Sequence, residues 1–235
     1  MRLNVPRAVA LCLAWVGLIC GVLVVSIQGI LPFRLGAVGP DAVFLALVEA
    51  EIFFVTVVWP FFMPRMLIPK AGIEAVRTAG PGGEPHLMIL QVGVLLVVAL
   101  PLALVSQNLS EISAGQFFRG HLQVAALAVF VTVLLDVLGG ARTRPWYFLG
   151  FFTVSALFPF LEFLASESGG SPKLGFLAAF SPFWGAAQLQ AGAPLGWAPG
   201  VQAAIFGVLA VGLLAAAPFL GAGAVSRSKI QDPRP

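Results

Sequence analysis

Charged side chains are scarce in this sequence: Asp, Glu, Lys and Arg make up only 10% of its 235 residues. Soluble domains carry about 25% charged residues, so this chain has too few charges to give a globule a water-soluble surface. Hydrophobic residues make up 59% of the chain, and its mean hydropathy is +0.99. Because no polar stretch exceeds about 30 residues, fewer than the ~50 that a domain needs, a separate soluble domain is excluded. The composition predicts one all-α integral membrane domain over residues 1–235.

Motifs for catalysis and for nucleotide binding are also missing. The sequence has no His-Glu-x-x-His for a zinc peptidase and no Gly-x-x-x-x-Gly-Lys-Ser/Thr loop to hold a nucleotide phosphate. Its two histidines, His86 and His121, fall near the ends of apolar stretches and on opposite predicted sides of the membrane, which excludes paired haem ligands. We therefore predict that the chain is not an enzyme and binds no metal or cofactor of its own.

Cysteine is nearly absent, and the two that occur are too far apart to be joined. Cys12 and Cys20 lie in the first apolar stretch. In a helix they would be about 12 Å apart along the axis, too far for a disulfide. The net charge of +3 does not indicate a nucleic-acid partner. In a membrane protein, an excess of Lys and Arg mostly reports orientation.

What the sequence does contain is a series of six apolar stretches, each long enough to cross about 30 Å of hydrocarbon. They cover residues 8–31, 41–63, 87–106, 121–140, 145–165 and 200–220. With the N-terminus in the cytoplasm, the basic residues divide ten to three in favour of the cytoplasmic side. This split predicts six transmembrane helices with both termini cytoplasmic. The composition, rich in Ala, Gly and Pro and poor in Lys, favours a bacterial inner membrane.

The longest polar interruption in the first two-thirds of the chain covers residues 65–91 and separates the second and third stretches. Its middle has the pattern of a short amphipathic helix, which the run 80–83, Gly-Pro-Gly-Gly, would end. A cytoplasmic helix of this kind would be a docking element for a soluble partner. The alternative is a surface loop that only turns the chain. The candidate docking residues are Gly72, Ile73, Glu74, Val76, Arg77 and Thr78.

The connection between the fifth and sixth stretches contains two apolar pieces, residues 174–180 and 185–189, separated by Ser-Pro-Phe-Trp at 181–184. Each piece is too short to cross a membrane. The pattern predicts one or two short helices that lie in the external interface or dip into it, anchored by Trp184 and Trp197. The alternative is a capping loop with no role in transport.

Two acidic residues lie near the middle of the second stretch. Glu49 and Glu51 are two positions apart, so on a helix they point about 200° apart and cannot both face one groove. A charge at this depth is costly, so at least one should face protein or a water-filled path. We consider two roles: part of a substrate path or helix contact, or a structural hydrogen bond to Gln91, Gln123 or the backbone.

The other polar candidates lie near the ends of stretches. Asp136 is close to the basic turn at 142–144, which favours a structural salt bridge. Glu162 is expected to reach water at the external side. Pro159 should kink the fifth helix, and Tyr147 and Trp146, at its start, are predicted to be interfacial anchors.

Four segments in this order are similar to those of a known family. They are the Gly-Ile-Glu-Ala-Val-Arg-Thr-Ala run at 72–79, the Ile-Ser-Ala-Gly-Gln-Phe run at 112–117, the Arg-Thr-Arg turn at 142–144 and the Phe-Ser-Pro-Phe run at 180–183. Over nearly its whole length, the chain resembles the six-helix permease subunits of ABC exporters.

The resemblance implies a transport function with the chemistry in another chain. A separate ABC ATP-binding subunit would hold ATP and Mg²⁺ and dock on the loop around residues 65–86. A second copy of the permease, or a homologue, would complete the transporter in the lipid bilayer. The alternative function is a non-catalytic anchor or assembly subunit of a larger membrane complex.

Overall fold

The structure is a computed structural model that describes residues 2–3, 5–27, 41–61, 67–68, 85–110, 112–138, 144–167, 179–189 and 197–230. In these residues it is helical apart from a few turn residues and two paired strands of two residues, β1 (Arg2–Leu3) and β2 (Leu67–Ile68). The helices are α1 (Val5–Ile27), α2 (Asp41–Phe53), η1 (Phe54–Val58), α5 (Pro85–Ser110), α6 (Ala114–Leu138), α7 (Arg144–Phe152), η2 (Thr153–Leu157), α8 (Phe158–Glu167), α10 (Pro182–Ala187) and α11 (Ala198–Ile230).

Four helical segments in the described residues are long and apolar enough to cross a membrane. They are Asp41–Phe61, Ile89–Ser110, Ala114–Val137 and Ala198–Ala216. Two further apolar helices, Val9–Val25 and Pro145–Leu161, are shorter. The prediction of an all-helical chain compatible with multiple membrane crossings is confirmed at this level.

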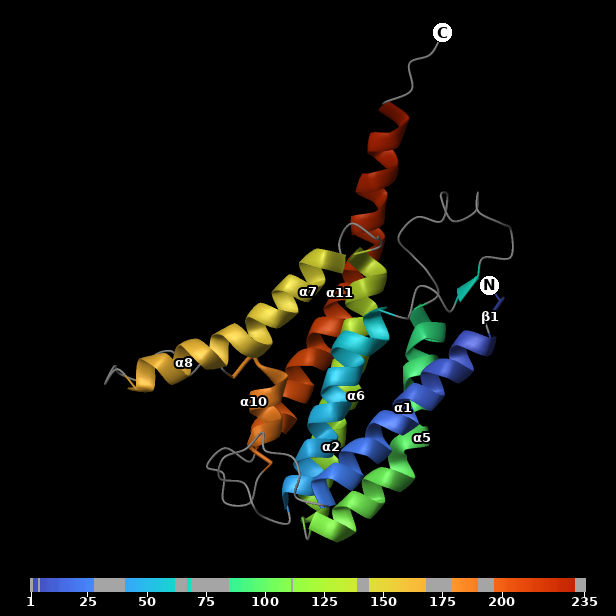
Figure 1. Cartoon of the computed structure of the whole chain (residues 1–235). Coiled ribbons are helices and arrows are strands. Elements are labelled where there is room, and N and C mark those ends of the chain that lie inside the picture. Colours follow the sequence, from blue (N-terminus) through green and yellow to red (C-terminus); the bar gives the residue numbers. More distant parts are fainter. Residues whose placement is uncertain are drawn as a thin grey trace.

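The second of these helices is the centre of the bundle. It continues from α2 through the π-helical turn η1 to Phe61, and it contacts α1, α5, α6 and α10. In the most apolar 18-residue part of this helix 61% of the residues are buried, compared with 28% in the corresponding part of α5. The view in Figure 1 shows α1, α2, α5 and α6 gathered together, α11 running along α6, and α7 to α8 leaving the bundle at an angle.

The first helix is held to this centre through a tryptophan. Trp15 is fully buried, and its ring centroid lies 4.1 Å from that of Phe54 in η1. The indole Nε1 donates a hydrogen bond of 2.9 Å to the carbonyl of Leu95 in α5. One side chain on α1 therefore joins three helices.

The turn between α5 and α6 is much tighter than the sequence suggests. The predicted apolar stretches 87–106 and 121–140 leave residues 107–120 as a polar connection, but α5 continues to Ser110 and α6 begins at Ala114. The reason is a capping box. The backbone N–H of Gln116 donates to Ser113 Oγ at 3.2 Å, and the backbone N–H of Ser113 donates to Gln116 Oε1 at 3.0 Å. The predicted long connection is wrong, because polar side chains here satisfy helix ends.

The pairing of β1 with β2 brings the residues before α1 next to a segment after the second helix. Arg2 pairs with Ile68 and Leu3 with Leu67, in antiparallel register. The N-terminal strand and part of the 65–91 segment therefore lie at the same end of the bundle (Figure 1).

Candidate functional site

The predicted docking residues, Gly72, Ile73, Glu74, Val76, Arg77 and Thr78, lie outside the described residues, so their role stays a prediction. The same is true of the Glu162 side chain. Glu49, Gln91 and Asp136 are half-buried on α2, α5 and α6, respectively. Glu51 is far more enclosed, with 1% of its surface exposed.

A buried amide network holds the short helix α10 inside the bundle. Gln123 on α6 donates through Nε2 to the carbonyl of Pro182, at 2.8 Å, and to Gln202 Oε1 on α11, at 2.6 Å. Gln202 in turn donates through its own Nε2 to the carbonyls of Ala179, at 2.6 Å, and Ser181, at 3.0 Å. Two buried side chains thus satisfy three backbone carbonyls that precede or begin α10.

The Ser-Pro-Phe-Trp segment begins a helix rather than interrupting one. Ser181 is the N-cap of α10, with its Oγ accepting from the Trp184 N–H at 3.4 Å, and Pro182 occupies the first helical position. Pro182, Gly185 and Ala186 are buried, and α10 packs against α2 and α11. A short helix is therefore present where the pattern predicts one, and the amide network holds its buried face against the bundle. Its position at a membrane interface stays a prediction.

Gly185 lets α10 approach this network closely. A Cβ atom at this position would overlap the Gln202 side-chain amide and come within 2.8 Å of Gln123 Nε2. Only a residue without a side chain leaves both amides in place.

Two prolines each leave a helical carbonyl without its usual partner, and a hydroxyl from another segment bonds to each. Pro60 has no N–H to donate to the carbonyl of Thr56, in η1, which accepts from Tyr147 Oη at 2.8 Å. Pro159 likewise cannot donate to the carbonyl of Ser155, in η2, which accepts from Ser181 Oγ at 3.1 Å. These bonds tie α7 to the central helix and α10 to η2.

Tyr147 is therefore not the interfacial anchor that the sequence predicts. It is buried, and its hydroxyl points to a backbone carbonyl of the central helix. The neighbouring Trp146 remains 72% exposed.

Replacing Tyr147 by Phe should lower the free energy of unfolding by about 1–2 kcal/mol, because the Thr56 carbonyl loses a buried donor. The measurement is thermal unfolding of the purified chain in mild detergent. The matched control is Thr153→Val on the same helix, which removes an exposed hydroxyl bonded to its own Leu149 carbonyl. Equal stability changes for the two variants would mean that the Tyr147 bond does not hold α7 to the bundle.

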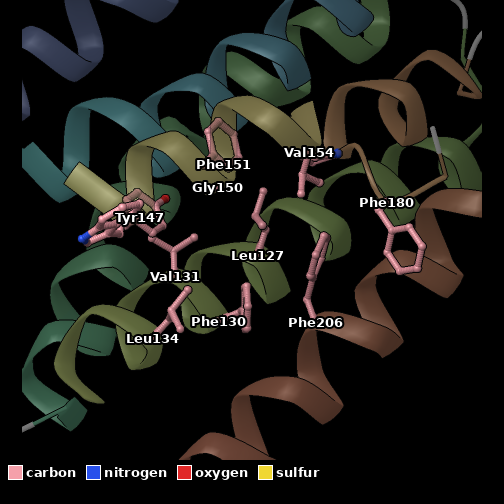
Figure 2. Close-up of a pocket in the computed structure, with 12 residues that line it drawn as sticks. Leu127, Phe130, Val131, Leu134, Tyr147, Gly150, Phe151, Val154, Phe180 and Phe206 are labelled. Atoms are coloured by element: carbon pink, nitrogen blue, oxygen red, sulfur yellow. The ribbon is translucent and has the colours of Figure 1, made fainter. Parts of the chain in front are cut away.

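A cavity of about 340 Å³ lies beside this tyrosine, between α6, α7, η2 and α11. Figure 2 shows apolar side chains from these helices around it, including Val131, Phe151 and Phe206. The Tyr147 hydroxyl already donates to Thr56. The volume falls in the range of about 300–1,000 Å³ common for small-molecule sites. Its lining suits a hydrocarbon or aromatic group and offers no partner for a charge.

The second polar site contains Glu51. Its Oε2 atom lies 3.7 Å from Nε2 of His121 on α6, so His121, and not Gln91 or Gln123, is the group opposite this atom. Sequence reasoning missed His121 because it assigned the residue to the end of a span. The capping box at Ser113 starts α6 earlier, and this puts His121 inside the helix.

Comparison of the chain with known proteins does not identify a family: no family model, no curated protein and no solved structure matches it.

Proposed function

We propose that the chain is the transmembrane permease subunit of an ABC-type exporter, driven by a separate ATP-binding subunit. The observation that carries the proposal is the place of the Ser-Pro-aromatic segment. In the resemblance, this motif precedes the last transmembrane helix. Here Ser181 and Pro182 begin a short helix before α11, and Gln123 and Gln202 fix it against α6 and α11. The motif thus lies at the place in the chain that the resemblance implies and is hydrogen-bonded to the neighbouring helices, which supports the proposal more than similarity of sequence alone.

The proposed topology has six spans. Four are the long apolar helices, and the other two are α1 and the continuous helix from α7 through η2 to α8. The last of these covers residues 144–167 and is about 36 Å long, enough to cross the hydrocarbon core. The side shared by β1 and β2 would be the cytoplasmic side, because the basic residues of the connections favour it.

In this proposal the conformational change driven by ATP hydrolysis is transmitted to the chain through the 65–86 loop. The ATP-binding subunit would move this loop, and with it the central helix and α5, which begin or end there. A second permease copy would be needed, since one chain of six helices encloses little lumen. Alternation between inward-open and outward-open packing would then carry the substrate across the membrane.

The docking loop gives a direct test. The tagged chain is purified in mild detergent from cells that also produce its natural partners, and the eluate is assayed for ATPase activity. We expect an ATP-binding subunit in stoichiometric amount. Changing Glu74 and Arg77 to Ala should reduce its recovery about tenfold or more, since loss of paired charges at an interface costs about 2–5 kcal/mol. The control is Lys229→Ala in the C-terminal segment.

Recovery of other membrane subunits without ATPase activity would overturn the proposal and favour the anchoring function. Equal recovery of the ATP-binding subunit by the double variant and the control would leave the transporter standing but place its docking surface elsewhere.

A further inference from the structure

Glu51 and His121 form an isolated ionisable pair within the bundle. The Glu51 Oε2 and His121 Nε2 atoms are 3.7 Å apart, and neither has a hydrogen-bond partner. This distance is within ion-pair range and slightly too long for a hydrogen bond, so a small movement of either side chain would join them. Glu51 is 1% exposed, whereas the His121 side chain is 20% exposed.

The other ring nitrogen determines which protonation states are possible. His121 Nδ1 lies 3.0 Å from the carbonyl of Phe117, and a carbonyl oxygen can only accept. Nδ1 therefore carries a proton. If His121 is neutral, its Nε2 presents a lone pair to Glu51, and an ionised Glu51 would present another. Two facing lone pairs, one on a buried and unpaired carboxylate, are strongly unfavourable.

We propose that Glu51 and His121 form a proton-binding site that holds one exchangeable proton between them. The proton resides on Nε2, which gives an imidazolium facing a carboxylate, or on Oε2, which gives a carboxylic acid facing a neutral imidazole. Both forms leave the pair without net charge inside the membrane. The ligand of this site is a proton.

The surroundings make the pair self-contained. Phe44 and Phe117 lie beside the imidazole, with ring centroids 5.8 and 4.3 Å from it. Among the described side chains, α5 and α10 carry no ionisable group. The packed elements otherwise carry Cys12 and Cys20 on α1, Asp41 and Glu49 on α2, Arg119 and Asp136 on α6, and Tyr147 on α7. Arg119 donates through Nε to the Gly115 carbonyl, and Tyr147 to the Thr56 carbonyl.

The partial exposure of His121 gives the proton a way in and out. His121 lies seven positions after the first residue of α6, about 10 Å from the end of the bundle where α5 turns into α6. Glu51 belongs to the central helix, and its side chain is buried. Separating α2 from α6 would hydrate both groups and allow each to take its own protonation state. Protonation is therefore linked to the packing of these two helices, a link that does not depend on the transport function.

The test counts protons on both groups. Because the chain has only two histidines, the variant His86→Asn leaves His121 as the single histidine. This protein, labelled with ¹⁵N-histidine and placed in lipid bilayer discs, reports Nε2 protonation by NMR. The infrared difference between this protein and its Glu51→Gln variant reports whether Glu51 is a carboxylic acid. Gln91→Leu, a polar residue lost from another helix, is the matched control.

We expect one of the two groups, and only one, to be protonated from about pH 5.5 to pH 8, with no change near pH 6.5, where a solvated histidine titrates. The Gln91→Leu control should give the same spectra as the His86→Asn protein. Glu51→Gln should remain folded, because its side-chain amide can donate to His121 Nε2. A neutral Nε2 beside an ionised Glu51 at neutral pH would overturn the proposal. So would an ordinary histidine transition near pH 6.5 that Glu51→Gln leaves unchanged.

Discussion

Replacing Gly185 by Ala should lower the free energy of unfolding by about 2–5 kcal/mol, the combined cost of overpacking and of buried polar groups left without partners. The added methyl would occupy the position of the Gln202 amide. That amide cannot simply swing away, because it bonds to Gln123 and to the carbonyls of Ala179 and Ser181. Moving it breaks the network that holds α10 in place.

The matched control is Gly150→Ala in α7, where an added Cβ meets no atom within 4 Å. This change should leave stability unchanged or raise it by up to about 1 kcal/mol, since Ala is the better helix former. Thermal unfolding in mild detergent compares the two variants. In the proposed transporter, Gly185→Ala should also lower ATPase activity coupled to transport.

A second variant makes the mechanism testable. In a Gln202→Ala background the closest clash partner is gone and only Gln123 Nε2 remains near the added methyl, so adding Gly185→Ala should cost much less than it does in the native chain. The two changes are thus expected to be non-additive by at least about 1 kcal/mol. Simple additivity, or a Gly185→Ala protein as stable as the native one, would contradict the packing described for α10.

Hydropathy and length were enough to predict the broad architecture. The described apolar helices fall on all six predicted stretches, and the helix ending at Ser110 and the one starting at Ala114 show the main boundary errors. The error arose because polar residues near a helix end have the composition of a loop. Here two of them, Ser113 and Gln116, cap the start of a helix instead. The capping signal was in the sequence as Ser-x-x-Gln.

The polar contacts between helices could not be predicted in the same way. Glu51 could be recognised as costly in a membrane, but its partner His121 is 70 positions away and nothing local links them. Pro159 could be recognised in the sequence as a kink in its helix. That Tyr147 would bond to the carbonyl released by Pro60 depends on how two helices pack, which periodicity does not encode. Contacts of this kind need the tertiary structure.

Replacing Trp15 by Ala should lower the free energy of unfolding by about 3 kcal/mol. Large-to-small changes at fully buried aromatic positions cost about 3–5 kcal/mol. The lower end of this range applies here, because the lipid around the helices is as apolar as the protein interior and burial of the ring gains little hydrophobic free energy. The loss combines the ring contact with Phe54 and the hydrogen bond to the Leu95 carbonyl. Both cysteines lie on α1, so a thiol-reactive fluorophore can follow its detachment during heating.

The indole contributes in two ways that further variants separate. Trp15→Phe keeps much of the ring but removes the donor, and should cost about 1 kcal/mol. Leu13→Ala, two positions away and 68% exposed, should change stability by no more than about 0.5 kcal/mol. If Trp15→Ala were no worse than Leu13→Ala, α1 would not be held by this side chain. The first helix would then be joined to the bundle mainly through its smaller apolar residues, such as Leu11 and Ile19, which face the same core.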